Sequence, residues 1–160
     1  MILEKGGYKF DVNIDATKEY YKTHSVCDCS CCRNFEAQVG EYLPNLKAFL
    51  DEFGVDISKP DETGSVENEK DKTIEYIFAA YTVNGNVMED CEFEIDIDDS
   101  QFISIVVNQG GVPNEHINED YFCLTVYNIV LPWVLDEAFP ISIKMPSMLD
   151  KIKKIFYCGD

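Results

Sequence analysis

Apolar and polar residues alternate along much of this chain with the period of two that is typical of half-buried β-strands. Strands are expected over residues 8–14, 73–83, 87–98, 102–107 and 122–131. Asn84-Gly85 lies between two of these runs and predicts a tight hairpin turn of type I′. The pattern therefore predicts a mainly antiparallel sheet.

Other parts of the chain place apolar residues three and four positions apart, which is the spacing of an amphipathic helix. The expected helical segments are a short turn near Tyr21, a helix over 32–43, a second helix over 44–53 and a C-terminal helix over 147–156. Pro44 suits the first turn of a helix, and Gly54 suits the position just after the end of one. These two residues set the expected bounds of the second helix.

Two stretches show no periodicity and are rich in Gly, Pro and charged residues, so we expect long loops over 58–72 and 108–120. Helices followed by consecutive strands predict an α+β fold. We expect one domain over residues 1–160, with two N-terminal helices, a mainly antiparallel sheet and a C-terminal helix. A chain of 160 residues can bury a core of its own without disulfides or other staples.

Charge narrows the range of partners. Thirty acidic residues against thirteen Lys and Arg give a formal net charge of −17. Binding to phosphate backbones depends on Lys and Arg, so nucleic acid is not expected as a partner, and anionic membrane surfaces are disfavoured for the same reason. A basic protein or cations would be attracted, although an acidic surface also serves solubility alone.

We expect neither a signal peptide nor a membrane-spanning helix. Residues 1–6 lack the basic and apolar regions of a signal peptide, and no apolar run has the length of a membrane-spanning helix. We therefore expect a cytosolic protein with reduced thiols. Its odd number of cysteines, seven, also argues against a disulfide framework.

Four of the seven cysteines fall within residues 27–32. Zinc in proteins takes four tetrahedral ligands, mostly thiolates and imidazoles. Cys27, Cys29 and Cys32 are expected to supply three of them. His24 is the predicted fourth ligand, with Cys158 as the alternative. Cys31 is left out, because side chains of adjacent residues seldom converge on one ion.

Two other interpretations of the cluster stay open. Cys31 and Cys32 lie beside Arg33 at an expected helix N-terminus, a setting that lowers a thiol pKa and suits redox or nucleophilic chemistry. Alternatively, the cysteines only pack, because Cys is small and often buried. The sequence lacks the catalytic motifs of hydrolase, kinase and zinc-protease type, which favours a non-enzymatic role over an enzymatic one.

A row of carboxylates is the second candidate site. Period-two geometry places four acidic side chains on one face of the strand expected over 87–98, namely Glu92, Glu94, Asp96 and Asp98. Like charges in a row repel, and cations or a basic partner would relieve that repulsion. The row lacks the glycine and the distal glutamate of an EF-hand, so calcium is not expected. The alternative is a solvated face that prevents edge-to-edge pairing.

The run Cys27-x-Cys29-x-x-Cys32-Arg33-Asn34-Phe35 resembles the signature of a group of uncharacterised bacterial proteins. Further parts of the resemblance are residues 44–53, the run Gly54-Val55-Asp56-Ile57-x-Lys59-Pro60 and the tract 132–137. The resemblance covers about a quarter of the chain and implies no established activity. In that pattern Cys31 is an additional cysteine.

Together these features predict a non-enzymatic, cytosolic interaction protein with a small structural zinc site. A more specific expectation is an immunity-like or antitoxin-like inhibitor that uses the acidic row against a basic partner. A thiol-based redox protein or enzyme that uses residues 27–32 is the alternative.

Overall fold

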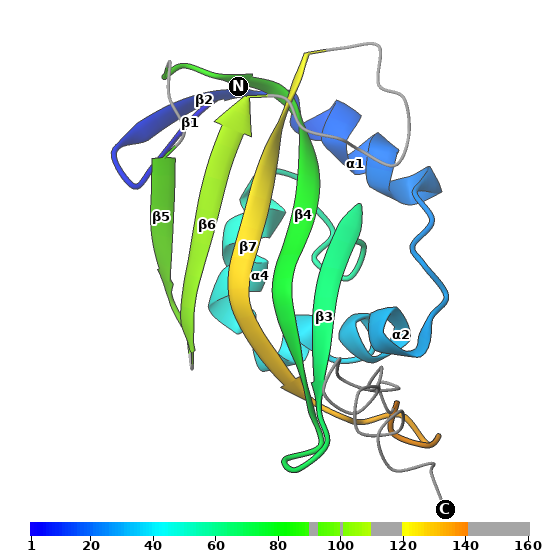
Figure 1. The fold of residues 1–160 in the computed structure, drawn as a ribbon. Coiled ribbons are helices and arrows are strands. Elements are labelled where there is room, and N and C mark those ends of the chain that lie inside the picture. Colours follow the sequence, from blue (N-terminus) through cyan, green and yellow to red (C-terminus); the bar gives the residue numbers. More distant parts are fainter. Residues whose placement is uncertain (90–92, 100, 110–119, 141–160) are drawn as a thin grey trace, which may run out of the picture.

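The computed structural model describes residues 1–89, 93–99, 101–109 and 120–140. Within these ranges seven strands form one antiparallel sheet, in the order β1-β2-β4-β7-β6-β5, with β3 paired to β4 (Figure 1). The strands are β1 (Ile2–Lys5), β2 (Tyr8–Val12), β3 (Glu62–Asn68), β4 (Thr73–Val87), β5 (Phe93–Asp98), β6 (Phe102–Gln109) and β7 (Tyr121–Pro132). The α+β prediction is confirmed. The expected C-terminal helix over 147–156 lies outside the described residues.

Four helices precede most of the sheet in the described sequence. They are α1 (Ile14–Thr23), α2 (Ser30–Glu36), α3 (Val39–Tyr42) and α4 (Pro44–Glu52). Asn13 caps α1 by accepting the N–H of Ala16 at 3.2 Å, and Gly54 follows α4 at a φ of +82°. None of the described helices has the length and hydropathy needed to cross a membrane.

The single helix expected over 32–43 is in fact two short helices, α2 and α3. The chain leaves helical geometry at Gln38, which has φ −143° and ψ −17°. The Gln38 side chain donates to the carbonyl of Pro132 at 2.7 Å, which ties the break to the end of β7. Phe35 before the break and Val39 after it are both fully buried.

The predicted hairpin at Asn84-Gly85 is wrong, because β4 continues through these residues. Gly85 lies opposite Val12 of β2, and a Cβ on Gly85 would come within 2.0 Å of the Asp11 carbonyl oxygen. The glycine is therefore required by the close approach of two strands and not by a turn.

The predicted loop over 58–72 is wrong in part, because it contains β3. This strand pairs with the first half of β4 and is at most partly buried along its whole length. A strand that buries neither face has no reason to alternate apolar and polar residues, so the pattern that predicts strands was absent.

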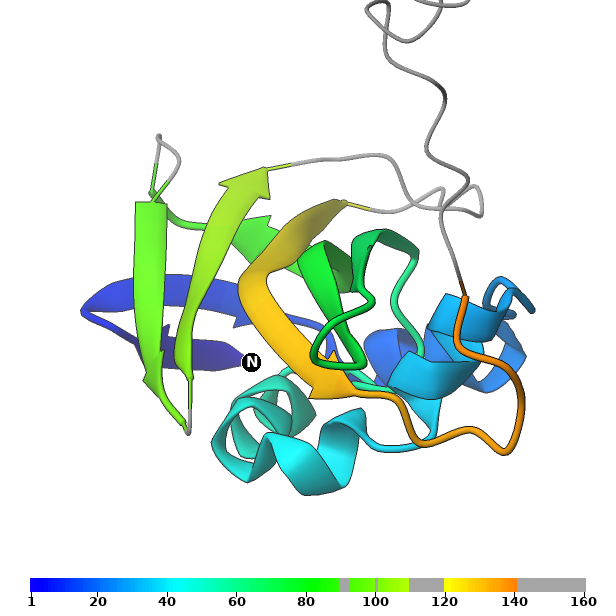
Figure 2. The same ribbon diagram turned by 60° about the horizontal axis from the view of Figure 1, so that its bottom comes forward.

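Helices cover one side of the curved sheet, and Figure 2 shows the sheet arching over α4. Leu46 and Leu50 of α4 and the following Phe53 are fully buried. The ring of Phe53 contacts Phe10 of β2 edge-to-face, with centroids 5.2 Å apart. This core holds the helical layer against the sheet and so fixes the position of α2, which carries the cysteine cluster.

Candidate metal centre

Three cysteine side chains converge where α2 begins. Cys27 lies in the segment between α1 and α2, Cys29 is the N-cap residue of α2, and Cys32 lies in its first turn. Their three Sγ atoms all lie within 4.8 Å of one another. The chain is extended at Cys29 (φ −74°, ψ 158°) and helical immediately afterwards, and this change of direction brings the spacing Cys-x-Cys-x-x-Cys to one point.

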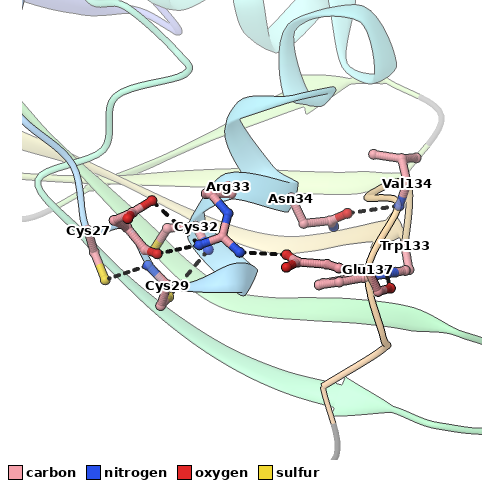
Figure 3. A network of polar contacts seen from close by, with 9 residues as sticks. Cys27, Cys29, Cys32, Arg33, Asn34, Trp133, Val134 and Glu137 are labelled. Carbon is pink, nitrogen blue, oxygen red and sulfur yellow. Dashed lines mark hydrogen bonds and ion pairs between the residues drawn. The ribbon is translucent and has the colours of Figure 1, made fainter.

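Backbone N–H groups point at two of the sulfurs (Figure 3). Cys29 donates its N–H to Cys27 Sγ at 3.4 Å, and Cys32 donates its N–H to Cys29 Sγ at 3.5 Å. Hydrogen bonds to sulfur favour the thiolate, which is the form that binds a metal. The turn is therefore organised to hold negatively charged sulfur.

The pKa values of Cys29 and Cys32 are shifted in opposite directions. Partial burial is the largest influence on Cys29 and acts to raise its pKa, but the hydrogen bonds from Cys32 and its neighbours outweigh it and the pKa is lowered. Burial and the nearby sulfur of Cys29 raise the pKa of Cys32 to about 12. A bound cation would offset this raised pKa, because coordination deprotonates a thiol.

The three cysteines line a cavity of about 500 Å³. The other lining residues are Ser25, Val26, Ser58, Pro60, Asp61, Glu62, Thr63 and Ser65. Thr63 Oγ1 lies 3.6 Å from Cys32 Sγ. No lysine or arginine is among the described residues that line this cavity, so its only charged side chains are acidic.

His24 lies apart from the three sulfurs and is not in the group that they form. Its buried imidazole stacks on the ring of Tyr20, and its Nε2 lies 3.8 Å from Asp61 Oδ1. Tyr20 donates its hydroxyl to the same Asp61 oxygen. Both ring nitrogens of His24 lack a hydrogen-bond partner within the described residues. The role of His24 as fourth ligand stays a prediction, and Cys158 lies outside the described residues.

Helix α2 is fastened to the segment that follows β7 (Figure 3). Asn34 accepts the N–H of Val134 at 2.9 Å and donates to the carbonyl of Pro132 at 3.1 Å. Arg33 forms an ion pair with Glu137 at 2.6 Å. The residues that follow the cysteines therefore contact the tract 132–137, so the two most distinctive stretches of the sequence form one structural unit.

Cys31 lies on the other side of α2, buried in the hydrophobic core. Burial raises the pKa of its thiol. Arg33, which was expected to lower the pKa of Cys31 and Cys32, is bonded instead to Glu137 and to the carbonyl of Asp28. The structure thus gives neither Cys31 nor Cys32 the low pKa that the redox interpretation requires.

Of the acidic row, Glu94, Asp96 and Asp98 lie on β5, at the edge of the sheet. The side chains of Glu94 and Asp96 are exposed, while the alternating Phe93 and Ile95 are buried. Glu92 and the side chain of Asp98 lie outside the described residues, so the full row is not tested. Nearby, Asp99 accepts the N–H of Leu46 at 2.8 Å and so caps helix α4.

The second wall of the cavity is not predicted from the sequence. Residues 58–65 belong to the expected loop over 58–72, yet they bring Asp61, Glu62 and Thr63 beside the cysteines. The only available signal was the clustering of Asp, Glu, Thr and Ser in 58–65, a composition that is also typical of a solvated loop.

Comparison of the chain with protein-family models, curated proteins and solved structures finds no match.

Proposed function

We propose that this protein is a non-enzymatic binding protein that carries a zinc ion on Cys27, Cys29 and Cys32, with a fourth ligand supplied by the chain or from solution. The observation that supports the proposal is the convergence of three sulfurs within 4.8 Å. Zinc–sulfur bonds of about 2.3 Å put the sulfurs of a tetrahedral site roughly 3.8 Å apart, so only a small adjustment is needed to bind the ion.

Zinc is favoured over other divalent ions by the chemistry of the donors. Thiolate is a soft ligand that selects zinc or copper(I), whereas magnesium and calcium need oxygen ligands. The ion would join the extended segment before α2 to the first turn of that helix. It would also neutralise two of the three thiolate charges, which otherwise repel one another at this distance.

The first test is metal content, measured by mass spectrometry on protein purified without a chelator or a histidine tag. We expect about one zinc per chain, as for a single structural site. Replacing Cys29 with Ser removes a ligand and should lower both the metal content and the melting temperature. Cys31→Ala is the matched control, because Cys31 lies on the same helix outside the sulfur group, and it should keep the zinc.

Zinc-free protein with a melting temperature unaffected by chelator would refute the proposal. Thiol reactivity separates it from the redox alternative. Zinc-bound cysteines should react slowly with iodoacetamide near pH 6 until chelator is added, whereas a catalytic thiol of low pKa would react rapidly without chelator.

The partner in this proposal is a basic protein, bound in the manner of an immunity protein or antitoxin. The exposure of Glu94 and Asp96 on the edge strand β5 supports this choice. A basic probe protein should bind at low salt and be released at about 0.5 M salt, where charge interactions are screened within a few ångströms. Binding that is unchanged in the double variant Glu94→Gln, Asp96→Asn would exclude this surface.

A further inference from the structure

The three cysteines would supply three of the four ligands of a tetrahedrally coordinated ion. Within the described residues, no His, Asp or Glu side chain and no further Cys joins their group. The same three cysteines line the cavity of about 500 Å³. The space beside the three sulfurs is therefore large enough for a small molecule that could supply a fourth ligand to an ion.

The charge around this space selects the kind of molecule that can enter. A divalent ion with three thiolates carries a net charge of −1, and two acidic residues, the buried Asp61 and the exposed Glu62, are among those that line the cavity. The nearby cations point elsewhere, since Arg33 is paired with Glu137 and Lys59 Nζ donates to the carbonyl of Tyr21 at 2.7 Å. An anionic ligand would thus enter surroundings whose net charge, among the described residues and the ion, is negative.

We propose that the metal ion keeps an exchangeable fourth position facing this cavity, and that a small external thiol of neutral or positive charge occupies it. The inference rests on the proposed metal site. In the exchange a metal–sulfur bond forms, a bound water leaves, and the thiol proton passes to solvent. Sulfur is the favoured donor because it matches the three ligands already present.

The test uses the protein loaded with Co²⁺, whose visible absorption reports the ligands of the ion. The probes are 2-aminoethanethiol and mercaptoacetate, two small thiols of opposite charge. We expect a saturable spectral change, with the cobalt retained after gel filtration. The two thiols differ in acidity as well as in charge, so their affinities for one protein cannot be compared directly. The informative quantity is the ratio of the two affinities, measured in the wild type and in each variant.

Glu62→Gln should lower the preference for 2-aminoethanethiol roughly three- to tenfold, because it removes the negative charge that favours the ammonium group. Glu41→Gln is the matched control. It removes the same charge from helix α3, away from the cavity, and should leave the ratio unchanged. An equal change in both variants would refute the role of Glu62 and with it the proposed selectivity.

The remaining outcomes separate the two proposals. Failure to bind Co²⁺ would overturn the metal site itself. Binding of Co²⁺ with no response to either thiol would overturn only the exchangeable position. A response that appears only in Cys158→Ser or His24→Gln would also overturn it, because the fourth ligand would then come from the chain.

Discussion

At the scale of single residues, Asn34 is the polar side chain on which the site most depends. It is fully buried, and its amide bonds both the N–H of Val134 and the carbonyl of Pro132. An Asn side chain has one acceptor and two donors, which is the combination needed to bind both groups of one backbone strand. It therefore holds the cysteine helix α2 against the segment after β7.

Asn34→Ala should lower the free energy of unfolding by about 1–3 kcal/mol, because it leaves the N–H of Val134 without its partner and removes one of the two donors to the carbonyl of Pro132, the other being Gln38. Urea unfolding of the metal-free protein measures this loss. Arg33→Ala is the control, since its ion pair with Glu137 is half exposed and should matter less. A larger effect for Arg33 would contradict the assignment.

The residue scale also shows how far the sequence predicts the candidate site. The spacing of Cys27, Cys29 and Cys32 is sufficient to predict that their side chains converge, because an extended segment that enters a helix brings positions with this spacing together. The opposite wall of the cavity was not predictable in the same way. Thr63 reaches the cysteines only because β3 packs beside α2, and the two contacting residues, Cys32 and Thr63, are 31 positions apart in the sequence.

At the scale of elements, helix α1 takes the place of a missing strand beside β4. On one side of β4, pairing with β3 stops at Ala80 of β4, and pairing with β2 starts only at Gly85 of β4. In the gap, the Tyr21 hydroxyl accepts the N–H of Thr82 at 2.9 Å and donates to its carbonyl at 3.0 Å. Thr17 Oγ1 accepts the N–H of Asn84 at 3.1 Å. Side chains of α1 thus provide the hydrogen-bond partners of buried backbone groups of β4.

Tyr21→Phe should lower the free energy of unfolding by about 2–3 kcal/mol, because both backbone groups of Thr82 lose their partner. Chemical denaturation near pH 7 measures this loss. Tyr42→Phe is the control, because Tyr42 is exposed and its replacement should have little effect.

The same variant should change the response to alkaline pH. Burial, with the nearby Asp61, raises the pKa of Tyr21 well above its ordinary value. Because the folded-state pKa is higher than the unfolded-state value of about 10, the contribution of Tyr21 to stability is fully present below about pH 10. This contribution is lost as the pH rises toward the folded-state pKa. Stability should therefore fall above pH 10 in the wild type and fall less steeply in Tyr21→Phe. Equal slopes would show that Tyr21 is not the group responsible.

The elements also show why the sequence predicted one part of the sheet and not another. Strands β6 and β7 were predicted because each has a buried face, which imposes alternation on the sequence. Two other features were missed. Strand β3 has no such face, and Gly85 has the sequence of a turn but serves a close contact between strands. Local patterns report burial well and report pairing between distant segments poorly.

At the scale of the whole molecule, charge is the dominant property. A net charge of −17 on 160 residues makes the folded protein repel itself, since folding brings the carboxylates closer together. The exposed side chains of Glu94 and Asp96 are two positions apart on the edge strand β5 and add to that repulsion. The metal-free protein carries further negative charge wherever a cysteine ionises.

This repulsion predicts that salt stabilises the protein. The melting temperature should rise between about 10 mM and about 500 mM NaCl, as the screening length falls from about 30 Å to a few ångströms. Asp96→Asn should raise the melting temperature at low salt, and the gain should disappear at high salt. Asp51→Asn is the control, because Asp51 is paired with Lys47 at 2.5 Å and its loss also removes an attraction.

If Asp96→Asn gave no gain at low salt, the acidic row would carry no repulsion for a basic partner to relieve. The affinity for such a partner would then have to come from other contacts.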